Sequence, residues 1–113
     1  MAHEQTSIDT KLIHAGEIRP GIEGAVSLPI FQSANFESVE GEEYHDIKYM
    51  RLSNSPNHTV LASKLAALES AESAFVTSSG MAALTAIFHS LLETGDHVIF
   101  QDCLYGGTYD YAR

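Results

Sequence analysis

The second half of the chain contains apolar residues at the spacing of an α-helix. A Ser-Pro pair marks the start of this stretch, because Ser55 suits an N-cap and Pro56 suits the first position of a helix. Three leucines then recur at helical spacing, at positions 61, 65 and 68. The pattern predicts a helix over residues 56–70.

A second apolar helix and two short apolar segments follow. Residues 80–93 place Met, Leu, Ile and Phe side chains on one side of a helix that ends before Gly95. Residues 74–77 (AFVT) and 97–100 (HVIF) flank this helix; both are short, apolar and bounded by polar residues, which predicts buried strands. We expect a further helix to begin within residues 108–113.

The order strand, helix, strand with short connections predicts a βαβ unit with parallel strands and a right-handed crossover. Such a unit needs both faces of its sheet covered, and two strands with two or three helices are too few to do so. We therefore expect the chain to be the amino-terminal part of a larger α/β protein. A self-contained small domain is the alternative.

Residues 1–48 show no sustained periodicity. Glycines at 16, 21 and 24 and prolines at 20 and 29 interrupt this stretch. We expect an extended arm with short turns. Such an arm has no core of its own, so it must lie on the rest of its domain or on a partner chain.

Charge and composition narrow the possible partners. The 113 residues carry 6 Lys+Arg and 15 Asp+Glu, a net charge of −9, which argues against binding to nucleic acid. Five acids lie close together in what we expect to be a solvated stretch, namely Glu37, Glu40, Glu42, Glu43 and Asp46. No apolar run approaches the roughly 20 residues of a membrane span. The first residues, MAHEQTSIDTK, contain no apolar signal core, so we expect a cytoplasmic protein that does not bind membranes.

The turn before the second predicted helix is a candidate anion site. Gly80 lets a ligand approach the backbone, and the N–H groups at the start of a helix lack intrahelical partners. Ser78 and Ser79 add hydroxyl groups, so the turn suits a phosphate monoester. A plain N-capped helix after a strand is the other interpretation.

Two further features are candidate ligand contacts. Tyr49 and Arg51 precede the first helix and could clamp a phosphate, although a solvated arginine beside a packed tyrosine is the alternative. Tyr105 precedes two glycines after the second predicted strand, where ligands lie in open α/β sheets. Its ring could stack on a flat cofactor. A turn aromatic that closes over the core is equally compatible with these residues.

Motifs of several other enzyme classes are absent. The sequence contains no G-x-x-x-x-G-K-[ST], G-x-G-x-x-G or G-x-S-x-G. Its six histidines are scattered without metal-ligand spacing, so we expect no metal site. The single cysteine, Cys103, excludes a disulfide within the chain, and we expect it to fill space at the end of a strand.

Taken in order, these features resemble the pyridoxal-phosphate enzymes of cysteine and methionine metabolism. This family includes cystathionine γ-synthase, cystathionine β- and γ-lyases, methionine γ-lyase and homoserine sulfhydrylases. The resemblance covers most of the chain in the family's order and spacing. The matching stretches are 10–16 (TKLIHAG), 29–36 (PIFQSANF), 49–69 (YMRLSNSPNHTVLASKLAALE), 74–83 (AFVTSSGMAA) and 95–109 (GDHVIFQDCLYGGTY).

The resemblance implies roles for five residues. Tyr49 and Arg51 match a Tyr-x-Arg that reaches across a dimer interface to the cofactor phosphate of the neighbouring subunit. Gly80 and Met81 match a pair whose backbone N–H groups hold the phosphate in their own subunit. Tyr105 matches a tyrosine that stacks on the pyridine ring and helps proton transfer, so it is the catalytic residue expected in this chain.

The chain also departs from the family pattern. The family's lysine that attaches the cofactor, and its aspartate that pairs with the ring nitrogen, belong to positions beyond this chain. The lysines here, Lys11, Lys48 and Lys64, lie in no such motif. Many members carry an arginine where this chain has Asp110, which puts the expected substrate contact in doubt. Methionine γ-lyases tend to carry a cysteine near Gly107, and its absence argues mildly against that activity.

The resemblance implies a fold-type I transferase in which residues 1–54 form the arm and 55–113 begin the cofactor-binding α/β domain. It implies pyridoxal 5'-phosphate as cofactor and trans-sulfuration chemistry, by β- or γ-elimination or γ-replacement, on sulfur amino acids or homoserine esters. It also implies a homodimer or homotetramer with shared active sites. Two alternatives stay open: an inactive fragment that only associates with a partner subunit, and an unrelated small α/β binding module.

Overall fold

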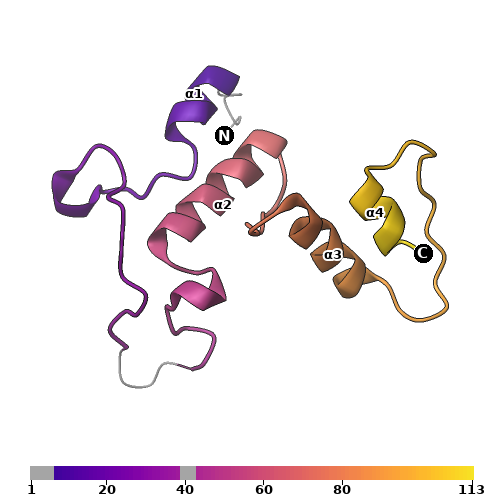
Figure 1. Ribbon diagram of the computed structural model, residues 1–113. Coiled ribbons are helices and arrows are strands. Elements are labelled where there is room, and N and C mark those ends of the chain that lie inside the picture. Colours follow the sequence, from indigo (N-terminus) through magenta and orange to yellow (C-terminus); the bar gives the residue numbers. More distant parts are fainter. Residues whose placement is uncertain (1–6, 39–42) are drawn as a thin grey trace. The chain divides into compact units, whose positions relative to one another are not determined.

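The computed structural model describes residues 7–38 and 43–113. The chain divides into two compact units, 1–76 and 77–113. In the described ranges the regular structure is entirely helical, with no strand (Figure 1). Its elements are the α-helices α1 (Ile8–His14), α2 (Pro56–Glu69), α3 (Gly80–Leu91) and α4 (Gly106–Tyr111) and the 3₁₀ turns η1 (Ile22–Gly24) and η2 (Met50–Leu52).

Helix α2 is the scaffold of the first unit, and its bounds confirm the helix predicted over residues 56–70. Ser55 occupies the N-cap position as expected. Its hydroxyl, however, is hydrogen-bonded with Nδ1 of His58 at 2.7 Å rather than with a backbone N–H of the helix. The helix ends at Ser70, where a left-handed φ of 54° turns the N–H back to the carbonyl of Ala66.

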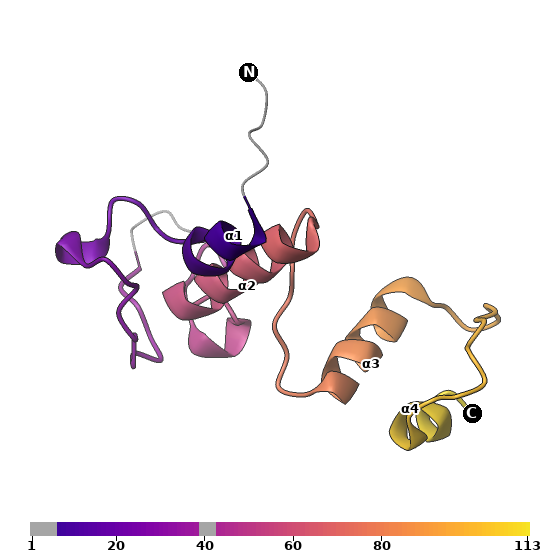
Figure 2. The same cartoon turned by 90° about the horizontal axis from the view of Figure 1, so that it is seen from above.

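Helix α1 lies within the stretch predicted to be an extended arm, so that prediction is wrong for these residues. The hydroxyl of Ser7 caps the helix by accepting a hydrogen bond from the N–H of Thr10 at 3.3 Å. A helix of only seven residues is too short to be stable by itself. In both ribbon views α1 lies against α2 (Figures 1 and 2), and this contact is what stabilises it.

Two lysines tie α1 to α2. Lys64 Nζ donates to the carbonyl of Ile13 at 2.8 Å, and Lys11 Nζ donates to the carbonyl of Ala67 at 3.4 Å. Both carbonyls lie in the last turn of a helix, where the oxygens lack intrahelical partners and a cation is favoured. The start of the arm is therefore supported by its own chain.

The later part of the arm is also fixed to α2. Asn57, in the first turn of α2, accepts a hydrogen bond from the N–H of Phe31 at 2.8 Å and donates to the carbonyl of Pro29 at 3.0 Å. The arm was expected to lie either on the rest of its own domain or on a partner chain. In the structure it contacts α2 of its own chain.

The acidic stretch is exposed wherever the structure describes it, as expected for a solvated segment. Glu37, Glu43 and Asp46 are all exposed. Glu40 and Glu42 lie outside the described residues, as do the first six residues of the chain.

The second unit consists of α3 and α4 with a long loop between them (Figure 2). An aromatic cluster holds the end of α4 on α3. The ring of Phe88 stacks on that of Tyr111 with 5.8 Å between centroids, and its edge meets Phe100 at 5.7 Å. The hydroxyl of Tyr111 is hydrogen-bonded with Nε2 of His89 at 2.9 Å. Helix α3 ends, and α4 begins, two residues earlier than predicted.

The βαβ unit is not confirmed, because the segments 74–77 and 97–100 form no strand in the part of the chain described here. All four residues of 97–100 are exposed, and Ile99 is 98% exposed. A parallel strand needs neighbouring strands that pair its backbone and layers that cover its side chains. Within the described residues Ala66 is the single buried hydrophobic residue, so such layers are not present to stabilise the strands.

Candidate functional site

A hollow of about 370 Å³ lies at the amino-terminal end of α3, within the second unit. Its volume is in the range of small-molecule sites. Three residues singled out from the sequence line it: Gly80, Met81 and Tyr105. Ser79 and Thr108 complete the lining. The start of α3 and the ring of Tyr105 therefore lie at one hollow.

The first turn of α3 offers backbone donors to this hollow. The carbonyl of Ser79 accepts the first helical hydrogen bond from the N–H of Ala83 at 3.0 Å, and its hydroxyl accepts from the N–H of Ala82 at 3.0 Å. The two preceding N–H groups, of Gly80 and Met81, have no acceptor among the described residues. Unpaired donors at the positive end of a helix dipole suit an anion such as a phosphate.

The ring of Tyr105 provides an aromatic surface beside these donors. Tyr105 occupies the N-cap position of α4 and is 75% exposed, so its ring is accessible to a flat ligand. Gly107 lies close beneath it, because an added Cβ there would be 2.9 Å from Cε1 of Tyr105. A glycine at this position leaves room for the tyrosine ring.

Thr108 is a residue of the hollow to which the sequence analysis gave no role. It is 7% exposed, and its hydroxyl donates to Sδ of Met81 at 3.8 Å. A signal for it was present, because residues three apart share one face of a helix and Thr108 comes three residues after Tyr105.

Tyr49 and Arg51 lie together in the first unit, on and beside η2. The guanidinium carbon of Arg51 is 4.7 Å from the centroid of the Tyr49 ring, a cation–π distance. Arg51 is exposed and has no ion-pair partner among the described residues, so its donors are available to an anion. The sequence-predicted site residues thus form two groups, one in each compact unit.

Asn54 fixes the loop that presents this tyrosine and arginine, and the sequence analysis gave it no role. Its Oδ1 accepts from the N–H of Tyr49 at 2.8 Å, and its Nδ2 donates to the carbonyl of Ile47 at 2.7 Å. The N–H of Met50 donates to the carbonyl of Ala34 at 3.0 Å, which joins the loop to the arm. The side-chain amide of asparagine commonly closes such turns, which is the signal that could have identified it.

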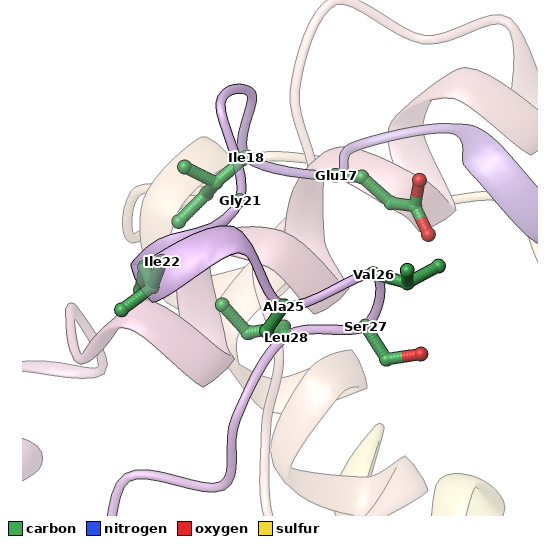
Figure 3. A pocket seen from close by; sticks show the side chains of 8 residues that line it. All are labelled: Glu17, Ile18, Gly21, Ile22, Ala25, Val26, Ser27 and Leu28. Carbon is green, nitrogen blue, oxygen red and sulfur yellow. The ribbon is translucent and has the colours of Figure 1, made fainter.

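One of the hollows of the first unit, formed by residues 17–28, is too small for a cofactor. It measures about 10 Å³, which is about the space that one water molecule requires. Figure 3 shows the side chains around it, of which only Glu17 and Ser27 carry oxygen atoms. Its lining consists of Glu17, Ile18, Gly21, Ile22, Ala25, Val26, Ser27 and Leu28.

Glu17 is the charged group of that small hollow. Nδ1 of His14 lies 3.2 Å from Oε2 of Glu17, and Nη2 of Arg19 donates to the same oxygen at 2.6 Å. The hydrogen bond with His14, followed by the charge of Arg19, holds the pKa of the Glu17 carboxyl below its usual value of 4.5. Because these two contacts already pair the Glu17 carboxylate, we assign it no role in ligand binding.

The described ranges, 7–38 and 43–113, contain no group of three or more His, Cys, Asp or Glu side chains placed to hold a metal ion. Nor do they contain a helix with the length and apolar character needed to cross a membrane.

Comparison with known proteins gives one consistent result. The sequence model of the family described as "Cys/Met metabolism PLP-dependent enzyme" matches residues 9–113. Cystathionine gamma-lyase from Bacillus subtilis is 40% identical over 100 residues, 88% of this chain and 26% of that protein. A probable cystathionine gamma-synthase from Herpetosiphon aurantiacus is 41% identical over 100 residues, 88% of this chain and 31% of its own length. Cystathionine beta-lyase MetC from B. subtilis is 38% identical over 109 residues, 96% of this chain and 27% of its length. The chain thus spans between a quarter and a third of these relatives.

Proposed function

Because the chain belongs to the family of pyridoxal-phosphate-dependent enzymes of cysteine and methionine metabolism, we propose that it forms the amino-terminal, phosphate-binding part of a trans-sulfuration enzyme. One observation carries the proposal. The unpaired N–H groups of Gly80 and Met81 and the accessible ring of Tyr105 line one hollow of ligand size. These groups fit a cofactor that joins a phosphate to an aromatic ring.

In this proposal the start of α3 and the ring of Tyr105 bind different parts of the cofactor. The N–H groups of Gly80 and Met81 donate to the phosphate, and the dipole of α3 favours its negative charge. The ring of Tyr105 stacks on the pyridine ring and excludes water from one face, and its hydroxyl donates or accepts a proton near the substrate. When bound, pyridoxal phosphate supplies an electron-withdrawing ring that stabilises negative charge on the substrate.

Tyr49 and Arg51 complete the phosphate site in the proposal. The exposed guanidinium of Arg51, which lies on the ring of Tyr49, is suited to a bidentate contact with phosphate oxygens. We propose that this pair serves the cofactor of a neighbouring subunit in a homodimer or homotetramer, so that the active sites are shared. Residues 1–54 then form the arm that carries the pair and 55–113 begin the cofactor domain.

The proposed substrates are sulfur amino acids or homoserine esters, which undergo β- or γ-elimination or γ-replacement in the cytoplasm. The named relatives are cystathionine lyases and a probable cystathionine synthase, which supports this substrate class. Asp110 stands where many members have an arginine, so we expect the contact with the distal part of the substrate to differ in this protein.

The lysines support a second candidate, an inactive fragment that only associates with a partner subunit. Lys11 and Lys64 are occupied in joining α1 to α2, and neither belongs to the unit that contains the hollow. Lys48 belongs to the same unit as these two, and none of the three lysines lies in the motif that attaches the cofactor in the family.

One experiment distinguishes the two candidates. The reading frame that contains these residues should continue into a segment with a cofactor-attaching lysine; we call its product the full-length enzyme. We expect the full-length enzyme to bind pyridoxal phosphate and to turn over cystathionine or an acyl-homoserine. The 113-residue chain alone, incubated with the cofactor and reduced with borohydride, should show no stoichiometric lysine labelling and no turnover. Turnover by the short chain would contradict the proposal, and a frame without such a lysine would favour the inactive fragment.

A further inference from the structure

Thr108 differs from the other residues that line the hollow of α3. Its side chain is buried at 7% exposure, whereas Tyr105, one helical turn earlier, is 75% exposed. The hydroxyl of Thr108 donates to Sδ of Met81 at 3.8 Å, and this is its one side-chain hydrogen bond among the described residues. A thioether is a weak acceptor, so this contact is worth little to overall stability. What it does is connect α4 to the first turn of α3.

The sulfur of Met81 is also a neighbour of the tyrosine ring. The point that a Cβ on Gly107 would occupy is 2.9 Å from Cε1 of Tyr105 and 3.3 Å from Sδ of Met81. The sulfur and the ring edge are therefore within about 6 Å of each other, close to the separation at which sulfur–aromatic contacts are favourable. The thioether of Met81 is thus a neighbour of both the hydroxyl of Thr108 and the ring of Tyr105.

We propose that Thr108 is a positioning residue for the cofactor ring, an inference that rests on the proposed function. Its hydroxyl holds the Met81 thioether, and the thioether supports the Tyr105 ring at a fixed position relative to the phosphate donors. The donors themselves are backbone N–H groups of α3 and do not depend on Thr108. The far end of α4 is held separately, by the stack of Tyr111 on Phe88. Loss of the Thr108 hydroxyl should therefore affect how the ring is bound and leave the phosphate contact unchanged.

The test compares Thr108→Val, which removes the hydroxyl at constant shape, with Thr108→Ser, which keeps it. Thr85→Val is the matched control, because Thr85 lies on α3 away from the hollow and its hydroxyl donates to the carbonyl of Ala82 at 3.2 Å. In the full-length enzyme, Thr108→Val should weaken binding of pyridoxal phosphate about two- to threefold, because a hydrogen bond to a thioether lies at the weak end of the range for neutral hydrogen bonds. Binding of inorganic phosphate should stay unchanged. Thr108→Ser and Thr85→Val should both match the unsubstituted enzyme.

A cofactor-free measurement tests the same contact. The ¹³C-methyl resonance of Met81 should shift in Thr108→Val and stay in place in Thr85→Val. If Thr108→Val does not fold, Met81→Leu provides the test, because it removes the sulfur while keeping an apolar side chain of similar size. It should reproduce the selective loss of pyridoxal phosphate binding.

The outcomes separate this inference from the proposed function. An unsubstituted enzyme that binds no pyridoxal phosphate would overturn the proposed function and with it this role of Thr108. An enzyme that binds the cofactor normally, with equal affinities in Thr108→Val and Thr85→Val, would overturn the inference alone. So would a loss of inorganic phosphate binding as large as that of the cofactor, because the effect would then be a general loss of structure.

Discussion

Replacement of Arg51 by alanine tests the division of the phosphate site between subunits. The guanidinium of Arg51 is exposed, and its central carbon lies 4.7 Å from the centroid of the Tyr49 ring, so its donors can reach an anion without first breaking an ion pair among the described residues. A charge-assisted hydrogen bond contributes about 1.5–3 kcal/mol. Arg51→Ala in the full-length enzyme should therefore weaken pyridoxal phosphate binding about ten- to a hundredfold, measured by titration of the cofactor's absorbance.

Arg113→Ala is the matched control for this substitution. Arg113 lies over the ring of Tyr109 at 5.0 Å, so its replacement removes the same charge and the same kind of cation–π contact. It is not part of the proposed clamp, so cofactor affinity should be unchanged. Equal losses in the two variants would show that net charge, rather than a phosphate contact of Arg51, governs the affinity.

A mixing experiment then determines which subunit Arg51 serves. At a cofactor concentration well below the raised Kd of Arg51→Ala, this variant and a variant without the cofactor-attaching lysine should each show little activity when alone. If the sites are shared, a mixed dimer contains one site with both defects and one site with neither, so part of the activity should return. No recovery, with subunit exchange demonstrated, would refute the assignment of the arm to a dimer interface and place Arg51 in its own chain's site.

Three further predictions concern single residues. Tyr105→Phe should retain the cofactor, because the ring still stacks, and should lower kcat; an unchanged kcat would remove its proposed role in proton transfer. Ser79→Ala should lower the thermal midpoint of the full-length enzyme through the loss of about 1 kcal/mol of helix capping, whereas Ser90→Ala, whose exposed hydroxyl bonds within α3, should change it much less. The pKa of Glu17 is lowered in the folded chain, so its contribution to stability is present above its usual pKa and is lost as the pH falls through the folded value. An NMR titration should place this pKa below 4.5, and His14→Ala should raise it; equal values in both chains would contradict the assigned cause.

The sequence could predict the elements that depend on short-range signals. The leucine spacing and the Ser-Pro start located α2 to within a residue. The anion site at the start of α3 was predicted from the same kind of short-range signal, because the first N–H groups of a helix have no intrahelical partner. That the turn of Gly80 and the ring of Tyr105 belong to one site was implied by the family resemblance alone, and in the structure both line one hollow.

Other features depend on contacts that no local pattern records. Helix α1 has little stability of its own and forms because Lys64 and Lys11 join it to α2. The role of Asn54 depends on where its two backbone partners lie, and that of Thr108 depends on the position of the Met81 sulfur. Each residue type is common in loops and helix starts, so position in space rather than identity gives it a role.

The same distinction explains why a candidate phosphate site forms although the described residues contain no strand. The donors of Gly80 and Met81 require one helical turn and the cap provided by Ser79, all within a few residues, and the chain-entropy cost of forming them is small. Strands at 74–77 and 97–100 would require pairing with segments distant in sequence, at a larger cost, and the described residues provide no layer to stabilise them. Placement of Tyr105 lies between these cases, because it depends on how α4 packs on α3 through the Thr108–Met81 contact and the Phe88–Tyr111 stack. The position of the ring is therefore the part of the site most sensitive to substitution, and the backbone donors of α3 are the least sensitive.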